Sequence, residues 1–155
     1  MGARVNVLTI GSFDYLHAGH ENLLKKCYLL RGMYGTITIG VNSDEFVRLY
    51  KNAPKFNTAQ RLARVQQDIG AWTQAEALVH DGDTPEFILS TGANLIVVGS
   101  DWGRADYLSQ LRISWDWLEE HRISLCYVPR TLGVSSSAFR EADLGPYFNG
   151  SQRDD

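Results

Sequence analysis

Two histidines with two residues between them stand in the stretch GSFDYLHAGH, residues 11–20. His17 and His20 follow an apolar run and precede a helical pattern, so both imidazoles are expected on one face of a helix start. The first N–H groups of a helix have no partner within it, and Gly19 lets a ligand come close to the main chain. One anion, above all a phosphate, would be able to contact all of these groups.

The same stretch also has a structural interpretation. Phe13 and Leu16 would then be core residues, Asp14 would be a local cap, and the histidines would be solvated. Its position at the end of a first strand and the start of a helix favours the anion site, because ligands of parallel α/β sheets bind at the carboxyl ends of the strands.

Strand and helix patterns alternate along the chain, which predicts an α/β fold with a doubly wound, parallel, five-stranded sheet. β-branched and apolar runs predict strands, and apolar residues at helical spacing predict helices between them. Asn57 and Gln60 are expected to cap one helix reciprocally, and Thr84 with Pro85 to begin another. The strands are expected at residues 4–10, 35–41, 75–80, 94–99 and 122–129, and helices near 23–30, 58–69, from 84, within a Trp-rich segment, and at 136–144.

The chain has 155 residues, 44% of them hydrophobic and 21% charged, which suits one soluble domain at residues 1–145 followed by a flexible polar tail at 146–155. The net charge of −3 argues against a general nucleic-acid binder. Cys27 and Cys126 stand in apolar surroundings without metal-ligand spacing and are expected to be reduced core thiols. Because no apolar run approaches the length of a membrane span and no signal-peptide pattern is present, we expect a cytoplasmic protein without a membrane partner.

Three loops that follow predicted strands are expected to meet at one edge of the sheet: residues 11–20, 99–104 and 130–137. Each combines glycine with histidine, arginine, serine or a helix start, the groups that bind phosphate oxygens. The third loop reads RTLGVSSS and leads into the last predicted helix.

The motifs in these loops resemble those of a known enzyme family. GSFDYLHAGHENLL resembles the signature of the HxGH nucleotidyltransferases, and RTLGVSSSAFR resembles the second signature of their cytidylyltransferase branch. VNSDEF, Arg61 and VVGSDWGRADYL are similar to the glycerol-3-phosphate cytidylyltransferase pattern, so that the resemblance covers roughly residues 4–142. It implies a Rossmann-like nucleotidyltransferase fold, a homodimer, and transfer of CMP from CTP to a small phosphorylated alcohol with release of pyrophosphate.

The resemblance also implies a role for each matching residue. His17 and His20 would bind the α and β phosphates, Arg130 would bind the β and γ phosphates, and Lys51 would close on them, with Lys55 as its alternative. Mg²⁺ would be bound through the triphosphate, and no protein metal ligand is assigned. The further residues expected to bind nucleotide are Gly11, Ser12, Phe13, Gly19, Asp101, Trp102, Thr131, Gly133, Ser135, Ser136 and Ser137, and those expected to bind the acceptor are Asp14, Arg61 and Lys55.

The acceptor and the base stay open at this point. The stretch DGDTPEF is acidic, whereas the glycerol-3-phosphate enzymes carry lysines there, and VNSD with DTPE also resembles adenylyltransferases that make ADP-sugars. An adenylyltransferase using ATP is therefore one alternative, and a non-catalytic nucleotide-binding module is another. His80 and His121 have no partner close in sequence and are expected to be structural, and one of Trp115 and Trp117 is expected in the core with the other at a dimer contact.

Overall fold

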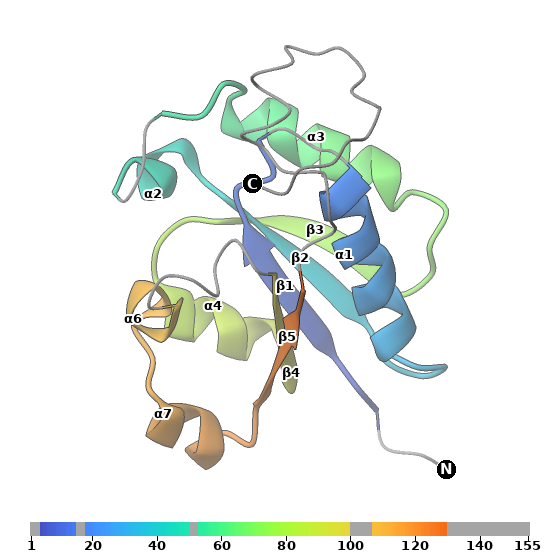
Figure 1. Ribbon diagram of the computed structural model, residues 1–155, viewed down its shortest axis with the longest axis vertical. Coiled ribbons are helices and arrows are strands. Elements are labelled where there is room, and N and C mark those ends of the chain that lie inside the picture. The colour runs from blue at the N-terminus through green and yellow to red at the C-terminus, as the bar shows by residue number, and fades with distance from the viewer. Residues whose placement is uncertain (1–3, 15–17, 50–52, 100–106, 130–155) are drawn as a thin grey trace.

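The computed structural model describes residues 4–14, 18–49, 53–99 and 107–129. Strands and helices alternate through this part of the chain (Figure 1). The elements are β1 (Val7–Gly11), α1 (Ala18–Leu30), β2 (Ile37–Asn42), α2 (Asp44–Arg48), α3 (Thr58–Asp68), β3 (Ala75–His80), α4 (Thr84–Thr91), β4 (Leu95–Gly99), α6 (Tyr107–Leu111), α7 (Trp115–Glu120) and β5 (Ser124–Val128). In the described ranges, no helix has the length and apolar character needed to cross a membrane.

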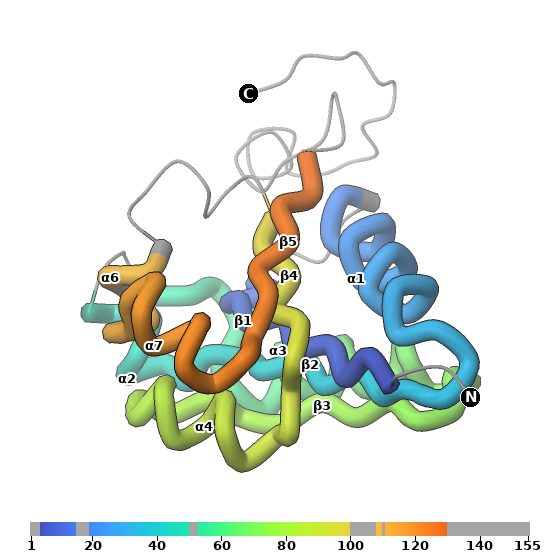
Figure 2. The backbone as a smooth tube through the Cα atoms, turned by 90° about the horizontal axis from the view of Figure 1, so that it is seen from below, coloured from blue at the N-terminus to red at the C-terminus, as the bar shows by residue number. Residues whose placement is uncertain are grey.

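The five strands form one parallel sheet in the order β3-β2-β1-β4-β5, seen from a second side in Figure 2. This confirms the predicted doubly wound α/β fold. The order reverses at β1, which pairs with β2 along its whole length but with β4 only at Val7↔Leu95 and Leu8↔Ile96. Further along, the Thr9 hydroxyl donates a 2.9 Å hydrogen bond to the Val97 carbonyl and links the two strands.

Helices cover both faces of the sheet, so β1 and β2 are buried throughout. On one face, α1 and α3 pack their apolar residues, including Leu24, Cys27 and Val65, on the strands. On the other face, α4, α6 and α7 contribute a second core that contains Ile88 and Leu118. Burial on both faces is typical of parallel sheets and explains why these strands read as continuous apolar runs.

The structure confirms one predicted helix start and corrects another. The Asn57–Gln60 capping box is present at the start of α3, as predicted. The N-cap of α4 is Asp83, which accepts from the Glu86 N–H, and not Thr84 as predicted. Thr84 is the first residue of the helix, and its hydroxyl bonds to a histidine ring.

The segment after β2 and the Trp-rich segment differ from expectation in detail. The stretch expected to be irregular contains α2, a five-residue helix whose N-cap Ser43 accepts from the Phe46 N–H. In the Trp-rich segment, the described residues form two short helices, α6 and α7. Trp117 packs against the second core, whereas Trp115 is 66% exposed. The expected helix at 136–144 and the tail at 146–155 lie outside the described residues.

Candidate active site

The turn between β1 and α1 carries the described part of the histidine motif. Gly19 and His20 lie in the first turn of α1, at the carboxyl end of the central strand, which ends at Gly11. The Phe13 ring packs edge-on against the His20 imidazole, with the ring centroids 5.5 Å apart, and is only 4% exposed. A Cβ on Gly11 would lie 3.3 Å from the Phe13 ring, so glycine leaves room for it. The Phe13 ring therefore supports His20 by packing, and the expected nucleotide contact of Phe13 stays a prediction.

Asp14 fastens this turn to the segment that precedes α3. Its two carboxylate oxygens accept hydrogen bonds from the main-chain N–H groups of Lys55 and Phe56, at 2.8 and 2.9 Å, and the residue is buried. The neighbouring Phe13 has a φ of +52°, a conformation that costs a non-glycine residue about 1–3 kcal/mol unless its surroundings impose it. Asp14 is one of these constraints, so the geometry makes it a brace of the turn, and its expected acceptor contact stays a prediction. The Lys55 side chain is exposed.

Arg61 holds the same turn from the other side. Its side chain is 1% exposed, and it forms a 2.7 Å ion pair with Asp44. Nη1 donates to the carbonyl oxygens of Ser12 and Asn42, at 2.8 and 2.7 Å, and Nε donates to the Phe56 carbonyl at 2.8 Å. Nη2 makes the ion pair and a longer contact of 3.5 Å with a threonine hydroxyl. Because protein acceptors use its donors, the expectation that Arg61 contacts the acceptor or phosphates is not supported by the geometry. Arg61 joins the ends of β1 and β2 to α2 and α3.

A second buried polar group lies at the ends of β2 and β3. The His80 ring is 0% exposed and lies between Asn42 and Thr84, with its Nδ1 2.7 Å from Asn42 Oδ1 and its Nε2 2.8 Å from Thr84 Oγ1. The aromatic rings of Phe46 and Phe87 pack edge-on against it, at centroid distances of 4.6 and 5.0 Å. Burial lowers the pKa of His80 to about 4, so the ring is neutral at pH 7. The expected structural role of His80 agrees with this burial.

The sequence did not point to Asn42, Asp44 and Thr84 as members of these networks. All three residues lie in the VNSD and DTPE segments, where the sequence indicates a family resemblance and, at Thr84, a helix start. His121, also expected to be structural, bonds through Nδ1 to the Trp117 carbonyl at 2.9 Å and stacks against the Trp117 ring.

Many of the predicted nucleotide contacts lie outside the described residues: His17, Lys51, Asp101, Trp102, Arg130, Thr131, Gly133, Ser135, Ser136 and Ser137. The strands β4 and β5, which precede the segments with Asp101 and Arg130, are described and show at which edge of the sheet these two segments begin. β4 and β5 are parallel to β1, so they end at the same edge of the sheet as the histidine turn.

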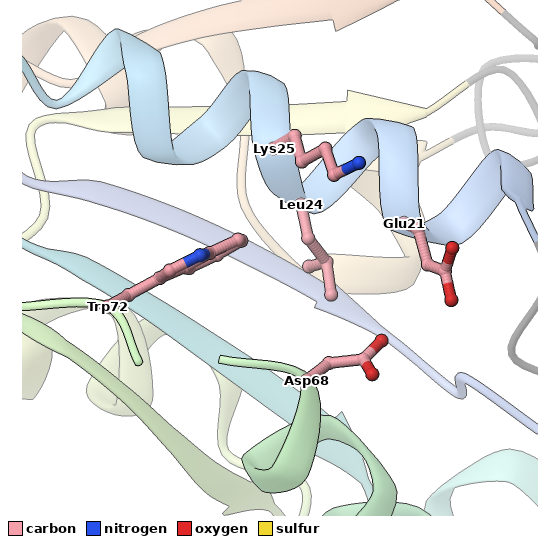
Figure 3. Close-up of a pocket in the computed structure, with 5 residues that line it drawn as sticks. All are labelled: Glu21, Leu24, Lys25, Asp68 and Trp72. Atoms are coloured by element: carbon pink, nitrogen blue, oxygen red, sulfur yellow. The ribbon is translucent and has the colours of Figure 1, made fainter. Parts of the chain in front are cut away.

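A cavity of about 150 Å³ lies near this turn, between α1 and the end of α3. Figure 3 shows Leu24 at its centre, Trp72 at one end, and the carboxylates of Glu21 and Asp68 at the other, with Lys25 above. None of these five residues had been predicted as a site residue. Because both acidic and basic side chains line this cavity, its charge does not favour the binding of an anion.

The comparison with family models decides the class of the protein. The model described as cytidylyltransferase-like matches residues 8–142. The chain belongs to the cytidylyltransferase-like family. This assignment confirms the predicted family and the prediction of a nucleotidyltransferase enzyme.

Relatives within the family differ in their named activities. The chain is 26% identical over 140 residues to the glycerol-3-phosphate cytidylyltransferase of Bacillus subtilis (strain 168), a match that covers 90% of this chain and 97% of the relative. It is 30% identical over 100 residues to the FAD synthase of Methanobrevibacter ruminantium, which covers 64% of this chain and 65% of the relative. Among solved structures, the lipopolysaccharide core biosynthesis protein from Thermoplasma volcanium GSS1 matches with a TM-score of 0.63 and 21% identity, covering 83% of this chain and 98% of that one. This likeness supports the fold alone.

Proposed function

We propose that the protein is a cytidylyltransferase that transfers CMP from CTP to a small phosphorylated alcohol, such as glycerol 3-phosphate, and releases pyrophosphate. One observation carries the proposal: Gly19 and His20 form the first turn of α1 at the carboxyl end of β1, where the strand order reverses. Nucleotides bind at this position in doubly wound sheets. The match to nearly the whole length of a glycerol-3-phosphate cytidylyltransferase supports the choice of CTP and acceptor.

The reaction needs little covalent assistance from the protein. An oxygen of the acceptor phosphate attacks the α phosphorus of CTP, the bond from this phosphorus to the α–β bridging oxygen breaks, and pyrophosphate leaves with that electron pair. The attacking oxygen is already anionic at neutral pH, so no strong general base is required. Positioning and neutralisation of charge then supply most of the rate.

The histidine turn is assigned to the leaving group. In this proposal, His17 and His20 bind the α and β phosphates and stabilise charge on the bridging oxygen, since imidazole donates from either nitrogen and can be protonated near pH 7. Arg130 and the serine run bind the β and γ phosphates at the start of a helix. Lys51, or Lys55 as its alternative, closes on the phosphates. The nucleoside is assigned to Asp101 and Trp102.

Mg²⁺ is part of the proposal as an ion held by the triphosphate oxygens. Within residues 4–14, 18–49, 53–99 and 107–129, no three His, Cys, Asp or Glu side chains gather in a way that would hold a metal. At nucleotide sites Mg²⁺ commonly takes its ligands from substrate phosphates and water, with one or two carboxylates. When bound, it neutralises charge on the triphosphate.

The test is an acceptor panel. The protein is incubated with CTP and Mg²⁺ and with phosphorylated alcohols, sugar phosphates and amino-alcohol phosphates, and products are identified by mass spectrometry. We expect a CDP-alcohol and pyrophosphate in equal amounts. His20→Ala should lower turnover by about 100-fold or more, the usual effect of removing a group that stabilises transition-state charge. His121→Ala is the matched control, because the His121 ring bonds to the main chain and packs against the ring of Trp117 within α7, away from the histidine turn.

The second candidate is an adenylyltransferase. The partial match to an FAD synthase favours it, because FAD contains an adenosine unit. A parallel panel with ATP separates the two: an AMP adduct without any CMP adduct would replace the first proposal. The non-catalytic module would be supported if the protein binds nucleotide but forms no product with either CTP or ATP, and if His20→Ala leaves this outcome unchanged.

We also propose a homodimer, which the resemblance implies. The monomer mass is 17.4 kDa. Light scattering is expected to give twice this value, and a monomer mass would refute the dimer.

A further inference from the structure

The structure contains a buried hydrogen-bonded chain, Asn42–His80–Thr84, at the ends of β2 and β3. We propose that His80 is a positioning residue for the acceptor, because it fixes the start of α4 against the end of β2. The inference rests on the proposed transfer reaction. It assigns to His80 a role that goes beyond filling the core.

His80 lies where four elements meet. It ends β3 and pairs in register with Asn42 at the end of β2. Its main-chain carbonyl accepts from the N–H of Ser43, the N-cap of α2, at 2.9 Å. Its ring bonds to Thr84 in α4 and packs against Phe46 of α2. A change at this ring is therefore felt by the starts of both helices.

The chemistry of the ring determines the direction of these bonds. The neutral imidazole has one N–H, and the Asn42 side-chain oxygen can only accept, so Nδ1 carries the hydrogen and donates to it. Nε2 then accepts from the Thr84 hydroxyl at 2.8 Å. The contact of the same hydroxyl with the Gly82 carbonyl is longer, at 3.3 Å, and is the weaker alternative. An oriented chain of this kind specifies one arrangement of the segments that it joins.

The chain continues to the histidine turn through Arg61. The carbonyl oxygen of Asn42 accepts from Arg61 Nη1 at 2.7 Å, and the same guanidinium group donates to the carbonyl of Ser12. Hydrogen bonds thus run from the turn after β1, through Asn42 and His80, to Thr84. Breaking this chain of hydrogen bonds is therefore expected to shift the start of α4 relative to His20.

The acceptor is expected on this flank of the turn. β4 and β5 lie on one side of β1, and the predicted triphosphate loop follows β5, whereas β2 and β3 lie on the other side. In phosphoryl transfer the attacking and leaving oxygens lie roughly in line. If pyrophosphate leaves toward the β5 flank, the acceptor approaches from the ends of β2 and β3, where the helices positioned by His80 begin.

The first test is His80→Phe, which keeps an aromatic ring between Phe46 and Phe87 but removes both ring hydrogen bonds. We expect the KM for the acceptor to rise about tenfold through the loss of these positioning hydrogen bonds, with the KM for the nucleotide within about twofold of wild type. His80→Gln retains one donor and one acceptor and should stay within about threefold of the wild-type acceptor KM.

Thr84→Val tests the same chain from its other end. It removes the hydroxyl while keeping the branched shape, and it should reproduce the rise in acceptor KM. Because both changes break the bond between His80 Nε2 and the Thr84 hydroxyl, the double variant with His80→Phe should be no worse than about the worse single variant. Independent additive effects on KM would contradict a chain through Nε2.

Ile123→Ala is the control for lost stability, because Ile123 is 7% exposed in the second core and immediately precedes β5, at the opposite edge of the sheet. It should lower the unfolding midpoint and leave both KM values unchanged. If the wild type turns over no acceptor, the proposed function fails. If the wild type does turn over an acceptor, two results would show that the positioning role is wrong. One is a folded His80→Phe variant with an unchanged acceptor KM, and the other is an Ile123→Ala variant whose acceptor KM rises as much as that of His80→Phe.

Discussion

Arg61 is the residue whose removal should disturb both the fold and the site most clearly. Arg61→Ala deprives three carbonyl oxygens of a donor, at Ser12, Asn42 and Phe56, and leaves the Asp44 carboxylate without its cation. Removing one partner of a buried ion pair costs about 3–5 kcal/mol, and a buried carbonyl that loses its donor costs about 1–3 kcal/mol. The Asp44 side chain is 23% exposed, so water compensates for part of this loss.

We therefore expect Arg61→Ala to lower the free energy of unfolding by about 4 kcal/mol, a large part of the roughly 5–15 kcal/mol of a typical domain. Denaturant unfolding followed by tryptophan fluorescence measures it. Arg61→Lys keeps the charge but not the planar array of donors, and should lose about half as much. It also provides a measurable variant if the alanine variant does not fold. Arg64→Ala, an exposed position on the same helix, should change stability by less than about 0.5 kcal/mol.

The pH dependence of this difference tests the ion pair itself. Burial raises the pKa of Asp44, but hydrogen bonds from Arg61 and from residue 58, with the charge of Arg61, outweigh it and hold the pKa below its ordinary value. A carboxyl of this kind stabilises the fold above its unfolded pKa, and the contribution is lost as pH falls through its folded pKa. The gap between wild type and Arg61→Ala should be widest near neutral pH and should narrow in acid. A gap below about 1 kcal/mol at pH 7, or an equal loss in Arg64→Ala, would refute the role assigned to Arg61.

Three further predictions concern the scaffold. Gly35→Ala should lower the free energy of unfolding by about 3 kcal/mol or more, because the new Cβ would overlap main-chain carbonyl oxygens. Gly70→Ala is its control, because a Cβ there meets only ordinary contacts and should leave the unfolding free energy nearly unchanged. Asn57→Ala should lower the free energy of unfolding by about 1 kcal/mol, because it removes the capping box of α3. An unfolding free energy equal to that of wild type would contradict this. Burial raises the pKa of the Cys27 thiol to about 12, so a thiol reagent at pH 8 should label the half-buried Cys126 first. Mass spectrometry measures the two labelling rates, and equal rates would show that Cys27 is not shielded.

The fold was predictable because its signals are local and repeated. Alternating apolar runs and helical spacing gave five strands in the right order along the chain, and the parallel arrangement follows from the helices between them. The five-residue helix α2 was missed because one helical turn buries too few residues to produce a period. Its local signals are the N-cap Ser43 and the charges at its two ends, and the Ser43 side chain would serve a turn equally well.

The burial of polar residues was much harder to predict. Arg61 is a charged residue on the buried face of α3, four residues before Val65, and its partners Ser12 and Asn42 are 49 and 19 residues away in sequence. His80 bonds to Asn42 across 38 residues, so it looked isolated. Nothing in the spacing of such residues indicates whether a donor is used by the protein or offered to a ligand. The histidine motif was easier to interpret, because its residues are adjacent and the strand and helix around it specify where they lie.

The use of Arg61 by the protein itself bears on how an acceptor phosphate would be held. The described carboxylates at the ends of β2 and β3 include Asp44 and the exposed Asp81 and Asp83, and Arg61, the cation buried among these ends, donates its hydrogen bonds to protein acceptors. A dianionic phosphate would be repelled from the start of α4. In the proposed reaction it should therefore face the histidine turn and Lys55, whose main chain is fastened to that turn by Asp14, while the uncharged part of the acceptor extends toward α4. The same arrangement explains how an acidic DGDTPEF segment is compatible with transfer to a phosphomonoester: this segment would contact hydroxyl groups of the acceptor, and the phosphate would lie elsewhere.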